Sequence, residues 1–412
     1  MAPREKQSKK NSSQTSDLKH AKQDQRTREK SLQTREAKSK RKRSIVVICC
    51  IVVLCVLAAI AVLWSMQQRG NKKDQSDQTP SAQTMQTADP AETQAPAEIP
   101  VSYVNPLTGE ACDAALLQKR PVAVMINNIY TSWPQFNTSR ADIIYECEVE
   151  GGLTRLMAIY SDIEQIKDSI GSVRSAREYY LDFAADFDAL FVHAGGADTA
   201  YIEMRARNTE HLDGVNGGVE GKYYVRDPRR SYLSYEHQLC ITGENVIAAA
   251  TEKGLRTTAT PNYAYPFHFV SGGQDPTAAG QTANEVQTPF SAVSGSFTYD
   301  SATQKYLRYE YGVAQTDALN DDVQLAFDNI VIIFCPYSYT GDAKGHIEVQ
   351  TTGSGEGYYI SHGKAVPITW SRTEHDVPMT LLGANGTALE MNPGKTFVCV
   401  MNSARKADVT FG

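Results

Sequence analysis

Charged side chains that could do acid–base or anion chemistry gather between residues 146 and 198. Glu146, Glu148 and Glu150 alternate with Cys147 and Val149, so in a strand the three carboxylates share one face at about 7 Å spacing. Carboxylates close to guanidinium groups can form an acid–base pair with split pKa values. A solvated strand face with ordinary salt bridges is the alternative explanation for the same pattern.

Arginines and a histidine follow this strand and could complete one site. Arg155 comes just after a Gly-Gly turn, and Arg174 and Arg177 are spaced to face one direction on a helix. His193 ends an apolar run before two glycines, where open α/β sheets place ligands. We therefore expect six residues to converge at one concave edge of a sheet: Glu146, Glu150, Arg155, Arg174, Arg177 and His193.

Roles follow from the residue types. Glu146, Glu150 and His193 are the candidate catalytic residues, and the three arginines are candidate ligand-binding residues. A half-buried histidine with its hydrogen bonds satisfied is the alternative for His193. Asp198 starts the predicted helix after His193 and is a further binding candidate, because ligands in open α/β sheets bind between a strand end and the next helix N-terminus.

A basic run inside an otherwise acidic region gives the last candidates, which are Arg226, Asp227 and His237. This run reads Arg-Asp-Pro-Arg-Arg from residue 226. It either binds a carboxylate or phosphate group or forms a polar network that holds a loop.

The elements expected to position these residues alternate between strands and helices over 101–270. Val122–Ile126 is typical of a buried strand, and 142–160 predicts a hairpin broken at Gly151-Gly152. Ser175 is the predicted N-cap of a helix reaching Ala185. Further elements are a strand at 189–193, a helix from Asp198 to Arg207 and a helix at 244–253. The pattern predicts an α/β domain.

Residues 280–412 change character and predict a mostly-β domain. Short apolar runs alternate with Gly, Asn-Gly and Pro-Gly turns. The runs are 297–299, 306–311, 330–334, 346–349, 358–360, 365–370, 379–382, 388–391 and 396–401.

The charge distribution of the 412 residues predicts a membrane anchor. Residues 1–44 hold 15 basic and 5 acidic side chains, and the remainder holds 26 basic and 42 acidic ones. Between the two lies the uncharged run Ile45–Trp64, about 30 Å long as a helix. The positive-inside rule then places a basic, disordered tail (1–44) in the cytoplasm, a single span at 45–66, a flexible linker at 67–100 and the body outside the cell. A cleaved signal peptide or a lipid-modified cysteine is the alternative.

Common catalytic and cofactor motifs do not occur in the sequence. It contains no HExxH, GxxxxGK[ST] or GxSxG segment. Five cysteines lie outside the predicted span without CxxC spacing: Cys112, Cys147, Cys240, Cys335 and Cys399. We expect buried thiols at Cys147, Cys335 and Cys399, and neither a designed disulfide framework nor a metal or cofactor site. The acidic body argues against nucleic acid as a partner.

Several blocks, in order, make residues 101–412 similar to the YerB-like family of bacterial envelope proteins. They begin at Asn105 (NPLTG), Arg120 (RPVAVMINN), Ala141 (ADIIYE), Glu150 (EGGLTR), Val173 (VRSAR), His193 (HAGG), Gly363 (GK), Ile368 (ITW) and Asn392 (NPGKT). The resemblance implies two successive domains outside the membrane, mostly in Gram-positive bacteria, and an unassigned activity. Gln238 and Gln315 depart from the family's typical Asn and His.

The sequence leaves three functions open. The first is a single-pass envelope protein of unassigned activity that binds an envelope protein, a cell-wall glycan or a wall-synthesis component. The second is a glycan- or peptidoglycan-acting hydrolase that uses Glu146, Glu150 and His193. The third is a receptor domain for a small anion or a metal. A deep cleft lined by the candidate residues would favour the second or third function, and a flat apolar patch elsewhere would favour the first.

Overall fold

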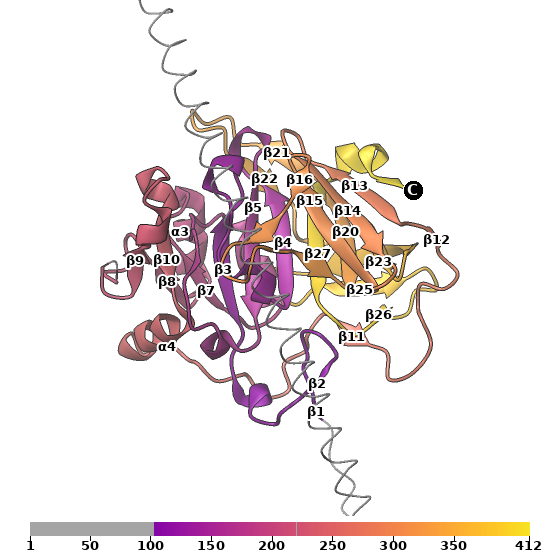
Figure 1. Ribbon diagram of the computed structural model, residues 1–412, viewed down its shortest axis with the longest axis horizontal. Coiled ribbons are helices and arrows are strands. Elements are labelled where there is room, and N and C mark those ends of the chain that lie inside the picture. The colour runs from indigo at the N-terminus through magenta and orange to yellow at the C-terminus, as the bar shows by residue number, and fades with distance from the viewer. Residues whose placement is uncertain (1–102, 220) are drawn as a thin grey trace, which may run out of the picture. The chain divides into compact units, whose positions relative to one another are not determined.

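The structure, a computed structural model, describes residues 103–412 except residue 220. All of these residues belong to one compact unit, and its architecture is mostly β with few helices (Figure 1). The predicted tail, span and linker at 1–44, 45–66 and 67–100 lie outside the described residues. Within 103–412, no helix combines the length and the apolar character needed to cross a bilayer.

A mixed sheet of 11 strands organises the described residues. Its path, from one edge to the other, is β12 (Gln281–Thr282), β24 (Lys364–Arg372), β23 (Gly353–Ser361), β20 (Asn329–Cys335), β27 (Thr396–Asn402), β4 (Ile143–Glu148), β5 (Thr154–Tyr160), β3 (Val122–Asn127), β7 (Leu190–His193) and β8 (His211–Asp213), with β25 (Thr380–Gly383) beside β24. Strands from 101–270 and from 280–412 therefore share this sheet, and they meet where β27 pairs in parallel with β4 (Figure 1).

A second sheet of six strands comes from the C-terminal half of the chain. It contains β16 (Val313–Ala314), β15 (Lys305–Glu310), β14 (Ser294–Asp300), β13 (Glu285–Pro289) and β28 (Thr410–Phe411), with β19 (Ala326–Phe327) beside β15. A three-stranded sheet joins β6 (Ile170–Gly171), β10 (Leu239–Ile241) and β9 (Tyr224–Arg226). Four two-stranded pairs complete the strands: β1 (Tyr103–Val104) with β2 (Ala111–Cys112), β11 (His268–Phe269) with β26 (Glu390–Met391), β17 (Thr316–Asp317) with β18 (Val323–Gln324), and β21 (Tyr337–Tyr339) with β22 (Ile347–Val349).

Three α-helices lie in the described part of the chain. They are α2 (Tyr179–Ala185), α3 (Asp198–Ala206) and α4 (Gly243–Glu252). The Thr242 hydroxyl accepts a hydrogen bond from the Asn245 amide and so caps α4. The 3-10 helices are η1 (Leu116–Gln118), η2 (Tyr130–Ser132), η3 (Thr138–Arg140), η4 (Glu150–Gly152), η5 (Ile163–Gln165), η6 (Pro228–Arg230), η7 (Tyr235–His237) and η8 (Ser403–Asp408).

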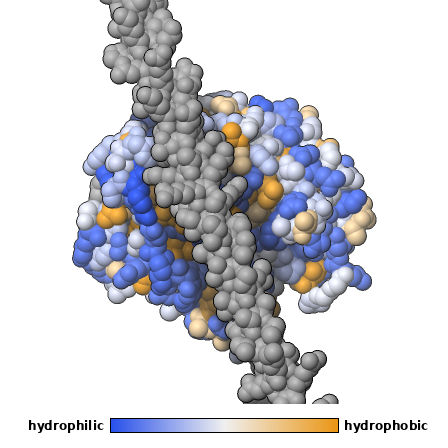
Figure 2. Space-filling view, in the orientation of Figure 1, coloured by the Kyte–Doolittle hydropathy of each residue, from blue (hydrophilic) through white to orange (hydrophobic). Residues whose placement is uncertain are grey.

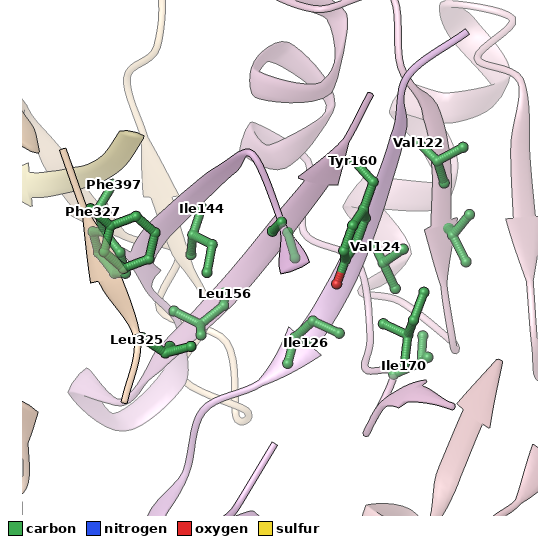
Figure 3. Close-up of a cluster of buried hydrophobic side chains, with 14 of the residues drawn as sticks. Val122, Val124, Ile126, Ile144, Leu156, Tyr160, Ile170, Leu325, Phe327 and Phe397 are labelled. Carbon is green, nitrogen blue, oxygen red and sulfur yellow. The ribbon is translucent and has the colours of Figure 1, made fainter. Parts of the chain in front are cut away.

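The large sheet is buried on both faces. One face packs against α4 and the second sheet, and Figure 3 shows Leu325 and Phe327 beside Leu156, Ile144 and Phe397 in this core. The other face packs against α2, α3 and the loops around them. Because both faces are covered, long strands of the sheet are apolar almost throughout, as in β3 and β20. On the part of the surface visible in Figure 2, hydrophobic residues form small patches scattered among hydrophilic ones.

Most predicted elements are confirmed, and one helix start is wrong. β4 and β5 form the predicted antiparallel hairpin, and Cys147, Cys335 and Cys399 are buried. Helix α2 begins at Tyr179 rather than after Ser175. The backbone of 174–176 instead forms hydrogen bonds with Met125 and Gly195, because this segment lies across the ends of β3 and β7. Arg174 and Arg177 therefore precede the helix and do not lie on it.

Candidate functional site

One edge of the large sheet carries most of the predicted site residues. Strands β27, β4, β3, β7 and β8 all run in the same direction, and β5 runs against them. Their carboxyl ends therefore meet at one edge, which is where open α/β sheets hold ligands. We call this the carboxyl edge.

The pleat of the sheet separates residues that we expected to share one space. Glu146 pairs with Leu156, and Cys147 pairs with Arg155, so Arg155 and Glu146 point to opposite faces. His193 stacks on Phe191, with ring centroids 5.3 Å apart. Phe191 belongs to the hydrophobic core on the same face of the sheet as Arg155. His193 is also three strands away from Glu146, roughly 14 Å at about 4.8 Å per strand. The expected convergence of all six residues is therefore wrong, although all lie near the carboxyl edge.

Glu146 belongs to a cluster buried between the two large sheets, which we call the carboxylate cluster: Glu146, Glu310, Arg308 and Asn128. Arg308 Nη2 donates to Glu146 Oε2 at 2.6 Å and lies 3.5 Å from Glu310 Oε2. Asn128 Nδ2 lies 3.1 Å from Glu146 Oε1 and 2.8 Å from Glu310 Oε1. All four side chains are fully buried. Because Glu146 comes from the 11-stranded sheet, and Arg308 and Glu310 come from the six-stranded sheet, the cluster connects the two sheets.

Two carboxyl groups share one guanidinium in this cluster, an arrangement that favours a proton on the pair. Burial and the neighbouring Glu146 raise the pKa of Glu310 to about 8, although Arg308 opposes the shift. Burial also raises the pKa of Glu146, again against Arg308. The pair can hold a proton at neutral pH, as catalytic carboxyl pairs do. A buried structural ion pair explains the same geometry, because each charge has a partner.

Arg155, Arg174 and Arg177 form the second group, which we call the arginine cluster. Arg177 holds Glu150 with two hydrogen bonds, of which Nη2 to Oε2 measures 2.7 Å. Arg155 Nη1 donates to the Ser175 carbonyl at 2.7 Å. Arg174 Nη1 lies 3.5 Å from the Glu236 carbonyl, and its buried Nε has no hydrogen-bond partner among the described residues.

The arginine cluster has more positive than negative charge. Within 4 Å, the one ion pair that the described residues make with it is the pair between Arg177 and Glu150. Burial and the adjacent Arg177 lower the pKa of Arg155 to about 10, although Glu150 opposes the shift. Burial also lowers the pKa of Arg174, where Arg177 again repels and Glu236 attracts. Burial raises the pKa of Glu150, but Arg177 outweighs it and leaves the pKa below its usual value. Such a cluster gains free energy from a bound anion.

His193 belongs to a third group with its own partners. Its Nδ1 lies 2.8 Å from the Gly195 carbonyl, and its Nε2 lies 2.9 Å from His211 Nδ1. Asp213 accepts from Gly195 N at 2.9 Å and from the Tyr201 hydroxyl at 2.6 Å. Burial lowers the pKa of His193 to about 4, so the ring is neutral at pH 7. These contacts match the satisfied, buried histidine that was the alternative explanation.

The basic run at 226–237 mainly holds loops together. Asp227 caps η6 by accepting from Arg229 N at 2.9 Å, and hydrogen bonds from Arg229 lower its pKa to about 2. Arg226 Nη1 donates to the Tyr235 carbonyl at 2.8 Å, and His237 Nδ1 lies 2.8 Å from Asn127 Nδ2. Asp198 lies in the first turn of α3. Among these candidates, His237 lies near Arg174, whose charge contributes to lowering its pKa, although burial contributes more.

Sequence reasoning missed the residues that complete the carboxylate cluster. Arg308 and Glu310 come from β15, far along the chain from β4. Alternate strand positions showed that Arg308 and Glu310 share one face, but hydropathy favoured burial of the opposite face. Gln315, where the family resemblance implies His, also faces this cluster, and its Nε2 donates to Asn128 Oδ1 at 3.0 Å.

The described residues form a β-rich fold whose large sheet carries two charged clusters at one edge. Comparisons with known proteins agree on the family to which this fold belongs. Residues 107–256 match the N-terminal domain, and residues 286–398 the C-terminal domain, of a family described as "Protein of unknown function (DUF3048)". A Bacillus subtilis (strain 168) protein named "Putative lipoprotein YerB" is 28% identical over 316 residues, which cover 74% of this chain and 88% of that protein. The crystal structure of YerB from Bacillus subtilis has the same fold, with a TM-score of 0.65 at 24% identity over 75% of this chain and 99% of that one. This chain belongs to the YerB-like family, as its sequence blocks indicated.

Proposed function

We propose that this chain is an envelope protein whose body binds an anionic group of a cell-envelope component at the arginine cluster. The observation that carries the proposal is the charge balance there. Three guanidinium groups have one carboxylate, that of Glu150, in ion-pair contact among the described residues. The ligand chemistry is a carboxylate or a phosphate, since both match the fork of an arginine. A cell-wall glycan or an envelope protein can carry either group.

Arg174 is the residue to change first. Within 103–412, its guanidinium makes one long hydrogen bond, to the Glu236 carbonyl, so its loss should cost the fold little. Inorganic phosphate is a suitable probe, compared with chloride at equal ionic strength. At ten times its Kd, a ligand stabilises the folded state by about 1.4 kcal/mol. We expect phosphate to raise the Tm of the full-length chain and of the control Arg205→Ala, and to leave the Tm of Arg174→Ala unchanged. An equal shift in all three proteins would refute the anion site.

We also propose the membrane topology that the charge pattern predicts. Ile45–Trp64 would cross the membrane once, with the N-terminus in the cytoplasm and residues 101–412 outside. The name of the Bacillus relative, which includes the word lipoprotein, supports a membrane-associated body but suggests a different means of attachment. Protease added to intact protoplasts should remove the body and spare residues 1–44. A secreted product that begins near residue 65 would exclude the anchor.

We further infer an α/β class for the N-terminal half of the body. All three described helices come from 101–270, as do the parallel strands β3, β7 and β8. Alternation of such strands with helices is the mark of that class.

The hydrolase alternative receives less support from the geometry. Glu146 is fully buried against Arg308, Glu150 is bound by Arg177, and His193 lies on the opposite face from Glu146. Catalysis by these three residues would require them to act on one scissile bond from two faces of the sheet. A wall-digestion assay with the full-length chain tests this alternative directly.

A further inference from the structure

Three aromatic side chains meet at the carboxyl edge next to Asn128 of the carboxylate cluster. Ring centroids lie 6.0 Å apart for Tyr130 and Trp133, 5.5 Å for Tyr130 and Tyr311, and 5.7 Å for Trp133 and Tyr311. Tyr130 is 57% exposed, while the other two are half-buried. We call these three residues the aromatic cluster.

The half-buried rings are held in place by their polar ends. Trp133 Nε1 and the Tyr311 hydroxyl both donate to the Asn128 carbonyl, each at 3.3 Å. Asn128 is itself anchored in the carboxylate cluster. Rings fixed in this way lose little conformational freedom when a ligand binds, so they suit a stacking surface. The exposed Tyr130 can then contact a ligand without rearrangement of the core.

A short chain of contacts connects the aromatic cluster to the arginine cluster. Arg230 donates to the Pro134 carbonyl at 2.8 Å and to the His237 carbonyl at 2.9 Å, so the loop that carries Trp133 lies beside η7. The Glu236 carbonyl in η7 is in turn the contact of Arg174. Stacking rings and an anion-binding group therefore lie on neighbouring loops of one edge.

We propose that the carboxyl edge binds an acidic polysaccharide, with one sugar ring stacked on the aromatic cluster and a carboxylate or phosphate elsewhere along the same polysaccharide held by the arginine cluster. This inference rests on the proposed function and names the ligand class of that site. Sugar rings present apolar C–H faces that aromatic rings cover, and they carry hydroxyl groups that suit a polar rim.

Single-stranded nucleic acid also combines stacking with anions, but the charge of the body opposes it. Residues 101–412 hold 23 basic and 37 acidic side chains. A nucleic-acid site needs a basic groove that follows several phosphates. One arginine cluster within an acidic body instead fits a ligand whose negative charges are sparse. The acidic polysaccharide is therefore the better match.

The test uses purified full-length chain and four probes: an oligogalacturonate, an uncharged N-acetylglucosamine oligomer, a single-stranded oligonucleotide and inorganic phosphate. We expect the oligogalacturonate to bind most tightly. Tyr130→Ala should weaken oligogalacturonate binding at least five-fold and leave phosphate binding unchanged. Tyr130→Phe should retain the affinity, because the ring remains. The matched control is Tyr103→Ala, since Tyr103 is exposed and lies close to Asn105, which contacts Ser161 after the far end of β5.

The outcomes separate this inference from the proposed function. If Tyr130→Ala and Tyr103→Ala bind oligogalacturonate equally well, the stacking site is refuted, and the phosphate arm still decides the anion site. The combined site is supported by two results together. Arg174→Ala should lose phosphate binding, and both Arg174→Ala and Tyr130→Ala should lose oligogalacturonate binding. Tightest binding of the oligonucleotide would overturn the assignment to polysaccharide. A Tyr130→Phe variant that loses affinity while its Tm is unchanged would also overturn it.

Discussion

The carboxylate cluster and the arginine cluster lie at the same end of β4 and β5 but on opposite faces of the sheet. In the first, Arg308 and Asn128 contact both buried carboxyl groups, and burial raises the pKa of each. In the second, three arginines have one carboxylate in ion-pair contact among the residues described. A closed, compensated cluster stabilises the fold, whereas a partly open cluster with surplus charge can bind a ligand. The balance of charge in a cluster and its access to solvent, rather than its residue types, show whether it stabilises the fold or can bind a ligand.

The largest effect on stability should come from Arg308→Met, which tests whether the carboxylate cluster stabilises the fold. This change leaves Glu146 and Glu310 buried without their cation, and it removes contacts of the guanidinium with Phe297 and Phe397. We expect the free energy of unfolding to fall by about 3–5 kcal/mol at pH 7. Urea denaturation measures this. The control Arg405→Met breaks a pair with Asp408 at the surface and one hydrogen bond to the Pro289 carbonyl, and it should cost about 1 kcal/mol. Equal losses of unfolding free energy in the two variants would contradict the stabilising role of the carboxylate cluster.

The second effect is a pH dependence of stability that arises in the carboxylate cluster. In the unfolded chain Glu310 releases its proton near pH 4.5, but in the folded chain it does so near pH 8. Between these values the folded state holds the extra proton, so stability falls as pH rises, by up to about 1.4 kcal/mol per pH unit. Unfolding free energies measured from pH 5 to 9 should show this decline. Glu310→Gln should flatten it, whereas Glu374→Gln, at an exposed position, should not.

The smallest expected effect is a change in phosphate affinity at the arginine cluster. Glu150 competes with any external anion for Arg177. Glu150→Gln removes that negative charge and should increase phosphate affinity about five-fold, equivalent to about 1 kcal/mol, which is the repulsion between unit charges about 4 Å apart in bulk water. Titration calorimetry with the full-length chain measures the change. Glu244→Gln, an exposed substitution on α4, serves as the control. An affinity that falls would mean that Glu150 chiefly positions Arg177.

Local sequence patterns predicted individual elements well, because their signals are local. The alternation at 142–160 indicated the hairpin, and Val122–Ile126 indicated β3. Ser175 failed as a helix cap because tertiary hydrogen bonds to β3 and β7 hold 174–176 in an extended path. Serine before a helical pattern is a weak signal when such contacts compete.

The site was harder to predict, because its composition depends on pairing between distant strands. The sequence identified Glu146 and Arg155 but could not say which face each takes until the register with β5 and β3 was known. It could not place Arg308 and Glu310 opposite β4, because hydropathy alone would favour burial of Leu307 and Tyr309 in that strand. The structure buries the alternate positions instead.

The position of β27 has a consequence for the biosynthesis of the protein. This strand is inserted between β20 and β4, yet it is synthesised after both of them, and long after β4. Until it arrives, the edge of β4 has unpaired backbone groups, which invite pairing with other chains. A chain that is exported before folding would therefore need protection from premature association until residues 396–402 have crossed. Truncation shortly before residue 396 should yield an aggregation-prone product rather than a shortened native one.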